Sequence, residues 1–141
     1  MFGPGTLDEG MRRRSIYFTV QRSRLVPFLQ AFDWPDSLTS AGARPTTVVA
    51  PQALLFLNNP QVRACAAGLA DRLLPAAQKS PGEAVDRAYR LAFGRPPNEQ
   101  ERAKGTAFLR ARRAASGDRL EQALCDYALV LLSLNEFIYV D

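Results

Sequence analysis

Histidine is absent from all 141 residues, and cysteine occurs only at Cys65 and Cys125. A chain without histidine cannot build a Ser-His-Asp triad or a histidine-ligated metal site. The two cysteines form no C-x-x-C pair, which excludes zinc fingers and c-type haem attachment in this sequence. We therefore expect no metal and no cofactor. Both cysteines lie among helical apolar residues, so we expect free buried thiols, with a disulfide in an oxidising compartment as the alternative.

Long apolar runs are also lacking. The longest, residues 123–134, is interrupted by Asp126 and is shorter than the roughly 18 to 20 residues that cross a bilayer. We predict no membrane span. The first ten residues are rich in glycine, proline and acidic side chains and show no charged segment followed by an apolar one, so no signal peptide is visible. They are expected to form a flexible lead-in.

Charge is moderately basic, with a net charge of +4, and every basic residue except Lys79 and Lys104 is arginine. Arginines cluster in two places, with Tyr17 and Phe18 beside the first cluster. Such a pattern clamps phosphates and stacks bases in some proteins, which makes nucleic-acid binding one hypothesis. Acidic residues interleave with both clusters, which favours a solvated, ion-paired surface and makes nucleic acid the weaker alternative. The clusters are Arg12, Arg13, Arg14, Arg22 and Arg24, and Arg110, Arg112, Arg113 and Arg119.

Helix start and stop signals dominate the second half of the chain. Three pairs have the spacing of capping boxes, with the capping residue three positions before the acidic one. We expect helices at 60–74, closed by Pro75, at about 81–93, ended by Gly94, at about 99–115, stopped by Gly117, and at about 120–134. The residues after 134 are expected to pack as a terminus. The three pairs are Ser80 with Glu83, Asn98 with Glu101, and Asp118 with Glu121.

The first half is less regular. Alternating Ile16, Phe18 and Val20 favour a strand at 15–20, with a short helix as the alternative, because no second strand is visible to pair with it. A short helix is predicted at 27–32. The sequence thus predicts an all-α array of about five to six helices with short connections and an irregular or extended N-terminal segment. We expect residues 1–10 to be a lead-in and 11–141 to be one helical domain.

The stretch 44–60 is the least polar and is bracketed by prolines. Prolines 45 and 51 predict extended backbone at 46–50 and a buried helix at 52–57, in which Leu54 and Phe56 are core residues. Asn58 is expected in the left-handed conformation and Asn59 as the cap of the next helix. The polar residues here are candidates for a binding site, although threonines that satisfy backbone groups near a helix start and asparagines that cap are the favoured explanation. They are Arg44, Thr46, Thr47, Gln52, Asn58 and Asn59.

No catalytic constellation is visible. Glu99 and Glu101 stand where helix N-termini favour negative charge, and nothing places Asp33 and Asp36 across a cleft. A nucleophile at Cys65 or Ser133 would have no base. We therefore expect no catalytic residues.

Five segments resemble, in order, a planctomycete domain of unknown function: 13–18 (RRSIYF), 27–33 (PFLQAFD), 50–60 (APQALLFLNNP), 88–97 (AYRLAFGRPP) and 134–141 (LNEFIYVD). The resemblance implies the C-terminal part of a longer domain, in exported proteins that also carry cytochrome-c-like domains. As written the chain would be cytoplasmic, and as a fragment of such a protein it would be exported. The resemblance supplies no catalytic residue.

We interpret the chain as a non-catalytic helical packing and interaction module. Its partner would be the upstream domains of a parent protein or a separate protein chain, and self-association is expected. The alternatives are nucleic-acid binding through the arginine clusters and an enzyme subunit whose site another domain completes.

Overall fold

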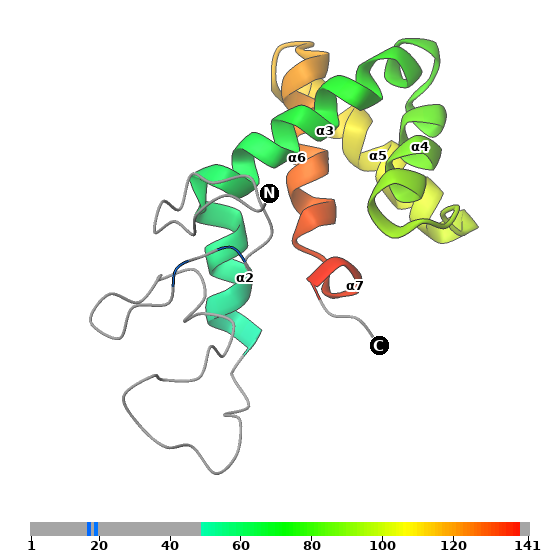
Figure 1. Cartoon of the computed structure of the whole chain (residues 1–141). Coiled ribbons are helices and arrows are strands. Elements are labelled where there is room, and N and C mark those ends of the chain that lie inside the picture. The colour runs from blue at the N-terminus through cyan, green and yellow to red at the C-terminus, as the bar shows by residue number, and fades with distance from the viewer. Residues whose placement is uncertain (1–16, 18, 20–48, 139–141) are drawn as a thin grey trace, which may run out of the picture. The chain divides into compact units, whose positions relative to one another are not determined.

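The structure is a computed structural model that describes residues 17, 19 and 49–138. These residues form six helices and no strand, which confirms the all-α prediction (Figure 1). The helices are α2 (Val49–Asn58), α3 (Pro60–Lys79), α4 (Pro81–Phe93), α5 (Glu99–Ala115), α6 (Leu120–Leu132) and α7 (Asn135–Ile138). The chain divides into two compact units, Met1–Leu55 and Phe56–Asp141, and each is considered by itself. That residues 11–141 form one domain stays a prediction.

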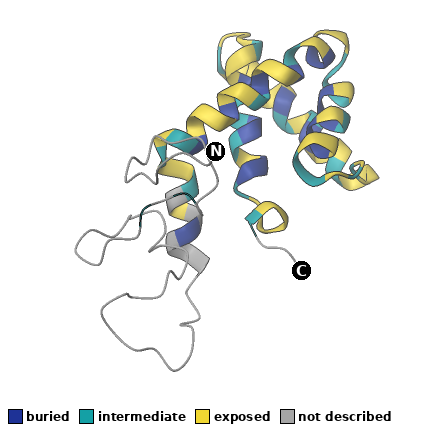
Figure 2. Cartoon of the chain, in the orientation of Figure 1, coloured by how far each residue is buried: buried dark blue, intermediate teal, exposed yellow. Residues whose placement is uncertain are grey.

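The core of the second unit lies between α3, α4 and α6. Figure 2 shows buried positions on the facing sides of these helices. Leu73, Val85, Leu124 and Leu131 are its largest fully buried side chains. Each contributes on the order of 1.5 to 3 kcal/mol relative to an exposed position. Between them the chain places alanines, which allow the helix backbones to approach closely: Ala84, Ala88, Ala123 and Ala128 are completely buried.

The structure confirms two of the helix caps predicted from the sequence. The Asn59 side chain accepts a hydrogen bond of 2.8 Å from the backbone N–H of Gln61 and starts α3. Asn98 and Glu101 form a complete capping box at α5, because each side chain accepts from the other residue's backbone N–H, at 2.8 Å and 2.7 Å. Gly94 ends α4 at a φ of 72°, as expected for a glycine in the left-handed conformation.

The other two capping pairs differ from the prediction. The Ser80 hydroxyl accepts from Glu83 N–H at 3.1 Å, but the Ser80 N–H is already bonded to the carbonyl of Ala76 at the end of α3. Only half of that box therefore forms. The pair of Asp118 and Glu121 is wrong. Asp118 has a φ of 66° and directs its carboxylate back to an arginine of α5, so α6 begins after Arg119 without a side-chain cap.

Pro75 does not close its helix, and this prediction is also wrong. It lies inside α3, which continues to Lys79. A proline in a helix interior costs roughly 3 kcal/mol. Here the turn after it buries Ala76 and Ala77, which offsets part of this cost. The C-terminal end of the chain also differs: α6 stops at Leu132, and the short α7 that follows contains no buried residue.

Helix α2 starts earlier than predicted, because Val49 and Ala50 are helical rather than extended. Pro51 then occupies the first turn, where its missing N–H has no helical partner to lose. Asn58 ends this helix with a negative φ, so the left-handed prediction is wrong. The expectation of an all-round buried helix is wrong as well, since Leu54 is 60% exposed.

On α5, Ala103, Ala107 and Ala111 are exposed. The buried face of this helix runs through Gly105 and Leu109. In the N-terminal half, the strand predicted at 15–20 is not supported: Tyr17 lies in a 3₁₀ turn and Thr19 in no regular element. The helix predicted at 27–32 lies outside the described residues.

Candidate functional site

Three of the six predicted binding residues lie in the part of the chain that the structure describes. Arg44, Thr46 and Thr47 lie outside the described residues. Gln52 is buried in α2, Asn58 is exposed at the end of α2, and the Asn59 side chain is used as the cap of α3. A ligand-binding role for this group stays a prediction.

A polar junction around Arg95 connects three helices of the second unit. Arg95, in the loop between α4 and α5, binds two carboxylates at once. Its Nη1 and Nη2 donate to Glu101 at 2.9 and 2.8 Å, and its Nε and Nη2 both donate to Glu136 at 2.7 Å. Its guanidinium also lies over the rings of Tyr89 and Phe93, at 5.4 and 5.9 Å from their centres. One side chain thereby links α4, the start of α5 and α7.

The electrostatics follow from this geometry. The hydrogen bonds from Arg95 lower the pKa of Glu101 from 4.5 to about 2, helped by the backbone N–H of Asn98. They also lower the pKa of Glu136 and raise that of Arg95. All three groups are therefore charged throughout the physiological range. This arrangement is suited to holding α7 in place, because one guanidinium binds a carboxylate at the start of α5 and another in α7.

An open apolar pocket of about 250 Å³ lies next to the junction. It is formed by α4, α5, α6 and Leu134, which lies between α6 and α7, and aromatic and aliphatic side chains make up most of its wall. Phe108 and Tyr127 pack ring against ring there, with centres 5.7 Å apart. Lys104 and Glu101 supply the charged groups of the wall. The lining residues are Tyr89, Glu101, Lys104, Gly105, Phe108, Tyr127, Val130, Leu131 and Leu134.

Tyr127 is the unusual member of this pocket. It is only 4% exposed, and its hydroxyl is buried without a hydrogen-bond partner among the described residues. Burial raises its pKa above the ordinary value, so the hydroxyl keeps its proton. Gly105 leaves the space that this hydroxyl occupies, because a Cβ at that position would lie 2.6 Å from the Tyr127 oxygen. Sequence reasoning missed Gly105, Arg95 and the orphaned hydroxyl, since only the packing of α5 on α6 reveals them.

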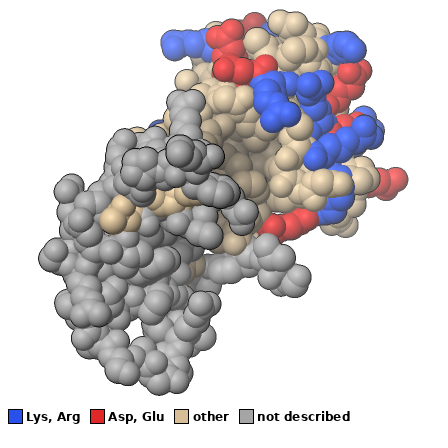
Figure 3. Space-filling view, viewed as in Figure 1, with Lys and Arg blue, Asp and Glu red and all other residues tan. Residues whose placement is uncertain are grey.

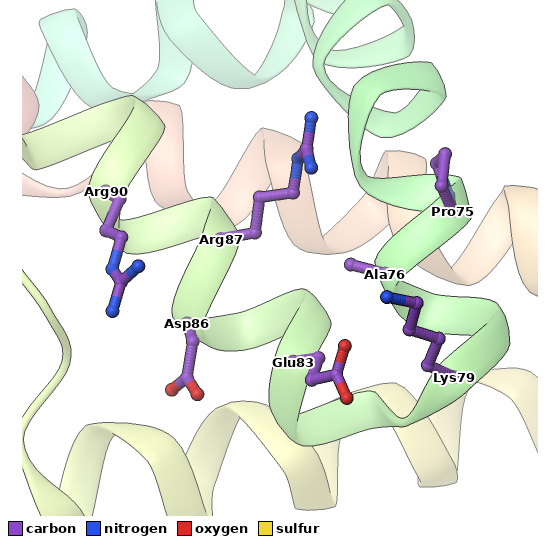
Figure 4. A pocket seen from close by; sticks show the side chains of 7 residues that line it. All are labelled: Pro75, Ala76, Lys79, Glu83, Asp86, Arg87 and Arg90. Atoms are coloured by element: carbon purple, nitrogen blue, oxygen red, sulfur yellow. The ribbon is translucent and has the colours of Figure 1, made fainter.

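A second, charged groove lies between the end of α3 and α4, with a volume of about 340 Å³ (Figure 4). Three cations line it, Lys79, Arg87 and Arg90, and within the described residues none of them has an ion pair. In Figure 4 Arg87 extends away from Asp86 and Arg90. Asp86 is paired with Arg102 of α5 at 3.1 Å. The cations thus do not converge on one point.

In the arginine cluster at 110–119, two of the four arginines form ion pairs with carboxylates of the described residues. Arg112 binds Asp126 at 2.6 Å, and Arg113 binds Asp118 at 2.6 Å. Figure 3 shows blue and red side chains interleaved on the visible face of the second unit. This agrees with the ion-paired surface expected from the sequence. The cluster at 12–24 lies outside the described residues.

The cysteines are free, but Cys65 is exposed and Cys125 only half-buried, so the expectation of buried thiols is wrong. Within the described part of the chain, no group of histidine, cysteine, aspartate and glutamate side chains is arranged to hold a metal ion. No helix of that part is both long and apolar enough to span a membrane.

The described residues form an all-α array with a polar junction and an apolar pocket. Comparison with known families assigns the chain to one of them. The model of a family described as PSD1, protein of unknown function (DUF1553), matches residues 5–109. The match covers more than half of the chain, which therefore belongs to the DUF1553 family. This confirms the resemblance to a domain of unknown function. No curated protein and no solved structure matches the chain.

The family match ends at Leu109, inside α5. Helices α6 and α7 lie beyond it, although Leu124 and Leu131 of α6 belong to the core of the second unit. The fold of the matched region thus depends on residues outside the match.

Proposed function

We propose that this chain is a non-catalytic helical module that binds protein, including a second copy of itself, through an apolar surface at α6 and α7. Three exposed apolar side chains carry the proposal: Val130, Leu134 and Phe137, which are 40%, 37% and 40% exposed. Val130 and Leu134 line the same pocket, and the backbone N–H of Phe137 donates to the carbonyl of Leu134 at 2.9 Å. Apolar side chains gathered on a surface mark protein interaction sites. The junction at Arg95 supports the proposal, because it fixes α7, and with it Phe137, through Glu136.

The non-catalytic part of the proposal is supported by the use of the carboxylates. Glu101, Glu136, Asp86, Asp118 and Asp126 are each bound to an arginine. Acid–base catalysis needs carboxylates that are available to a substrate. In this structure these five instead hold helices and loops together.

Self-association of the full chain tests the proposal. We expect the mass measured by light scattering to rise with concentration. The double variant Leu134→Ser with Phe137→Ser should stay monomeric and keep its helical circular dichroism. Leu91→Ser is the matched control, because Leu91 is 37% exposed but belongs to α4 and not to the surface at α6 and α7. It should associate like the wild type. A wild-type chain that is monomeric at every concentration would contradict the proposal.

Nucleic-acid binding stays the alternative. It is supported by Lys79, Arg87 and Arg90, whose charges have no ion pair among the described residues. Binding to single-stranded or duplex nucleic acid that weakens steeply with salt would favour it. The enzyme alternative, with a site completed by another domain around Arg44, Gln52, Asn58 or Asn59, also stays a prediction.

A further inference from the structure

We propose that two copies of the chain dock by mutual insertion, with Phe137 of each copy entering the apolar pocket of the other. Lys104 at the pocket of one copy would then lie toward Glu136 of the second copy. This inference deepens the proposed function and rests on it, because it names a second copy of the chain as the partner and specifies the contact that the surface at α6 and α7 makes.

Helix α7 lies at the rim of the pocket, and two sets of contacts place it there. Leu134, which lines the pocket, accepts a hydrogen bond from the backbone N–H of Phe137 at 2.9 Å. Glu136 shares the guanidinium of Arg95 with Glu101, which is part of the pocket wall. The exposed ring of Phe137 is therefore held next to the pocket, on a helix that the junction fixes.

The pocket has the size and the wall that an aromatic ring requires. Its volume is about 250 Å³. An engineered apolar cavity of about 150 Å³ in another protein holds benzene. Phe137 is 40% exposed, so its ring gains apolar burial by entering such a pocket. Insertion covers Val130 and Leu134 as well, because both line the pocket and both are exposed in the single chain.

Symmetry makes a second copy the fitting occupant. A chain that carries an exposed ring beside a ring-sized pocket can make both contacts at once across a two-fold axis. The assembly then closes at two chains, and neither the ring nor the pocket stays exposed. A head-to-tail arrangement makes only one of the two contacts for each pair of chains, and it would continue into longer assemblies.

The charges beside the ring and beside the pocket are complementary. The junction around Arg95 contains one cation and two carboxylates, which leaves one negative charge next to Phe137. The Glu136 side chain is 45% exposed. Lys104, on the pocket wall, is exposed and has no ion pair among the described residues. Mutual insertion brings this cation toward the glutamate of the other copy, so opposite charges meet at each of the two contacts.

Complementation between two single variants of the full chain tests the mutual insertion. Phe137→Ser removes the ring and keeps the pocket, whereas Val130→Arg places a long charged side chain at the pocket and keeps the ring. Both positions are exposed, so each variant should retain the helical circular dichroism of the wild type. Each variant alone should weaken dimerisation by about tenfold or more, as expected when an aromatic anchor no longer fills a partner's pocket.

An equimolar mixture of the two variants should dimerise more strongly than either variant alone at the same total concentration. In the mixed pair the intact ring of one chain meets the intact pocket of the other, which restores one of the two contacts. Sedimentation velocity measures the average mass, which should saturate at two chains for the wild type.

The charge contact has its own pair of variants. Lys104→Glu should weaken the dimer by about threefold to tenfold, because two like charges then face each other at each contact. Lys79→Glu is the matched control, since Lys79 is an exposed lysine at the end of α3, and it should leave the dimer unchanged.

A mixture that associates no more than the two variants alone overturns the inference, as does a wild-type mass that passes two chains without saturating. If Phe137→Ser associates like the wild type while the double variant Leu134→Ser with Phe137→Ser does not, the inference fails and the proposed function stands. A wild-type chain that stays monomeric at every concentration overturns both.

Discussion

The core between α3, α4 and α6 and the junction around Arg95 hold the second unit by different means. The core consists of buried leucines and alanines with one valine and two tyrosines, and it contains no charged group. The junction consists of one arginine and two glutamates that are all partly exposed to solvent. Burial stabilises a fold by kilocalories per side chain, whereas an exposed ion pair contributes on the order of 0 to 1 kcal/mol. The core therefore maintains the fold, and the junction positions α7.

The largest expected effect comes from removing core volume. Leu124→Ala should lower the free energy of unfolding by about 2 to 5 kcal/mol, since the side chain is completely buried and leaves a cavity. A chain cut after Leu109, where the family match ends, loses α6 entirely and should not fold. Urea denaturation measures the first and circular dichroism the second. A folded, cooperative 1–109 fragment would show that the core does not need α6.

Substituting each of two glycines by alanine should give the next largest effects on stability, with opposite signs. Gly105→Ala should destabilise by about 1 to 3 kcal/mol, because the new Cβ would lie 2.6 Å from the Tyr127 hydroxyl and 2.9 Å from a methyl of Val85. Gly68→Ala on α3 meets nothing within 4 Å and should stabilise by about 1 kcal/mol through helix propensity. Thermal denaturation of the two variants measures the difference. Equal effects would mean that α5 and α6 do not pack as described.

The sequence predicts the features of this arrangement that neighbouring residues determine and misses those that packing between helices determines. Asn59, Asn98 and Gly94 act within one turn of their own helix, and these assignments are confirmed. The predictions for Pro75 and Asp118 are wrong, because burial of the turn after Pro75 and the ion pair of Asp118 with Arg113 of the preceding helix decide their roles. The apolar pocket was not predictable, since Gly105 and Tyr127 meet only once α5 packs on α6. The same holds for Arg95, which binds Glu136 from 41 positions away.

The smallest effect is electrostatic and appears as a pH dependence. The pKa of Glu101 is about 2 in the folded chain and 4.5 as a free group, so its contribution is present above pH 4.5 and is lost as the pH falls toward 2. Glu101→Gln keeps a capping side chain and removes the charge. After allowance for solvent screening, it should cost about 0.5 to 1 kcal/mol at pH 7 and almost nothing near pH 2.

Denaturant titrations at several pH values measure this difference. Glu99→Gln is the control, because Glu99 stands in the same first turn without an ion pair among the described residues. It should show less than half the effect of Glu101→Gln at pH 7. A cost for Glu101→Gln that does not change with pH would show that the ion pair with Arg95 does not stabilise the chain.

Native-state hydrogen exchange of the full chain, in the wild type and in Arg95→Ala, tests most directly whether the core maintains the fold and the junction positions α7. The account predicts that amides of α3 and α6 exchange slowly and at the same rate in both proteins, while amides of α7 exchange faster and are accelerated further in the variant. Equal acceleration of α6 and α7 in Arg95→Ala, or an α7 as protected as α6, would contradict it.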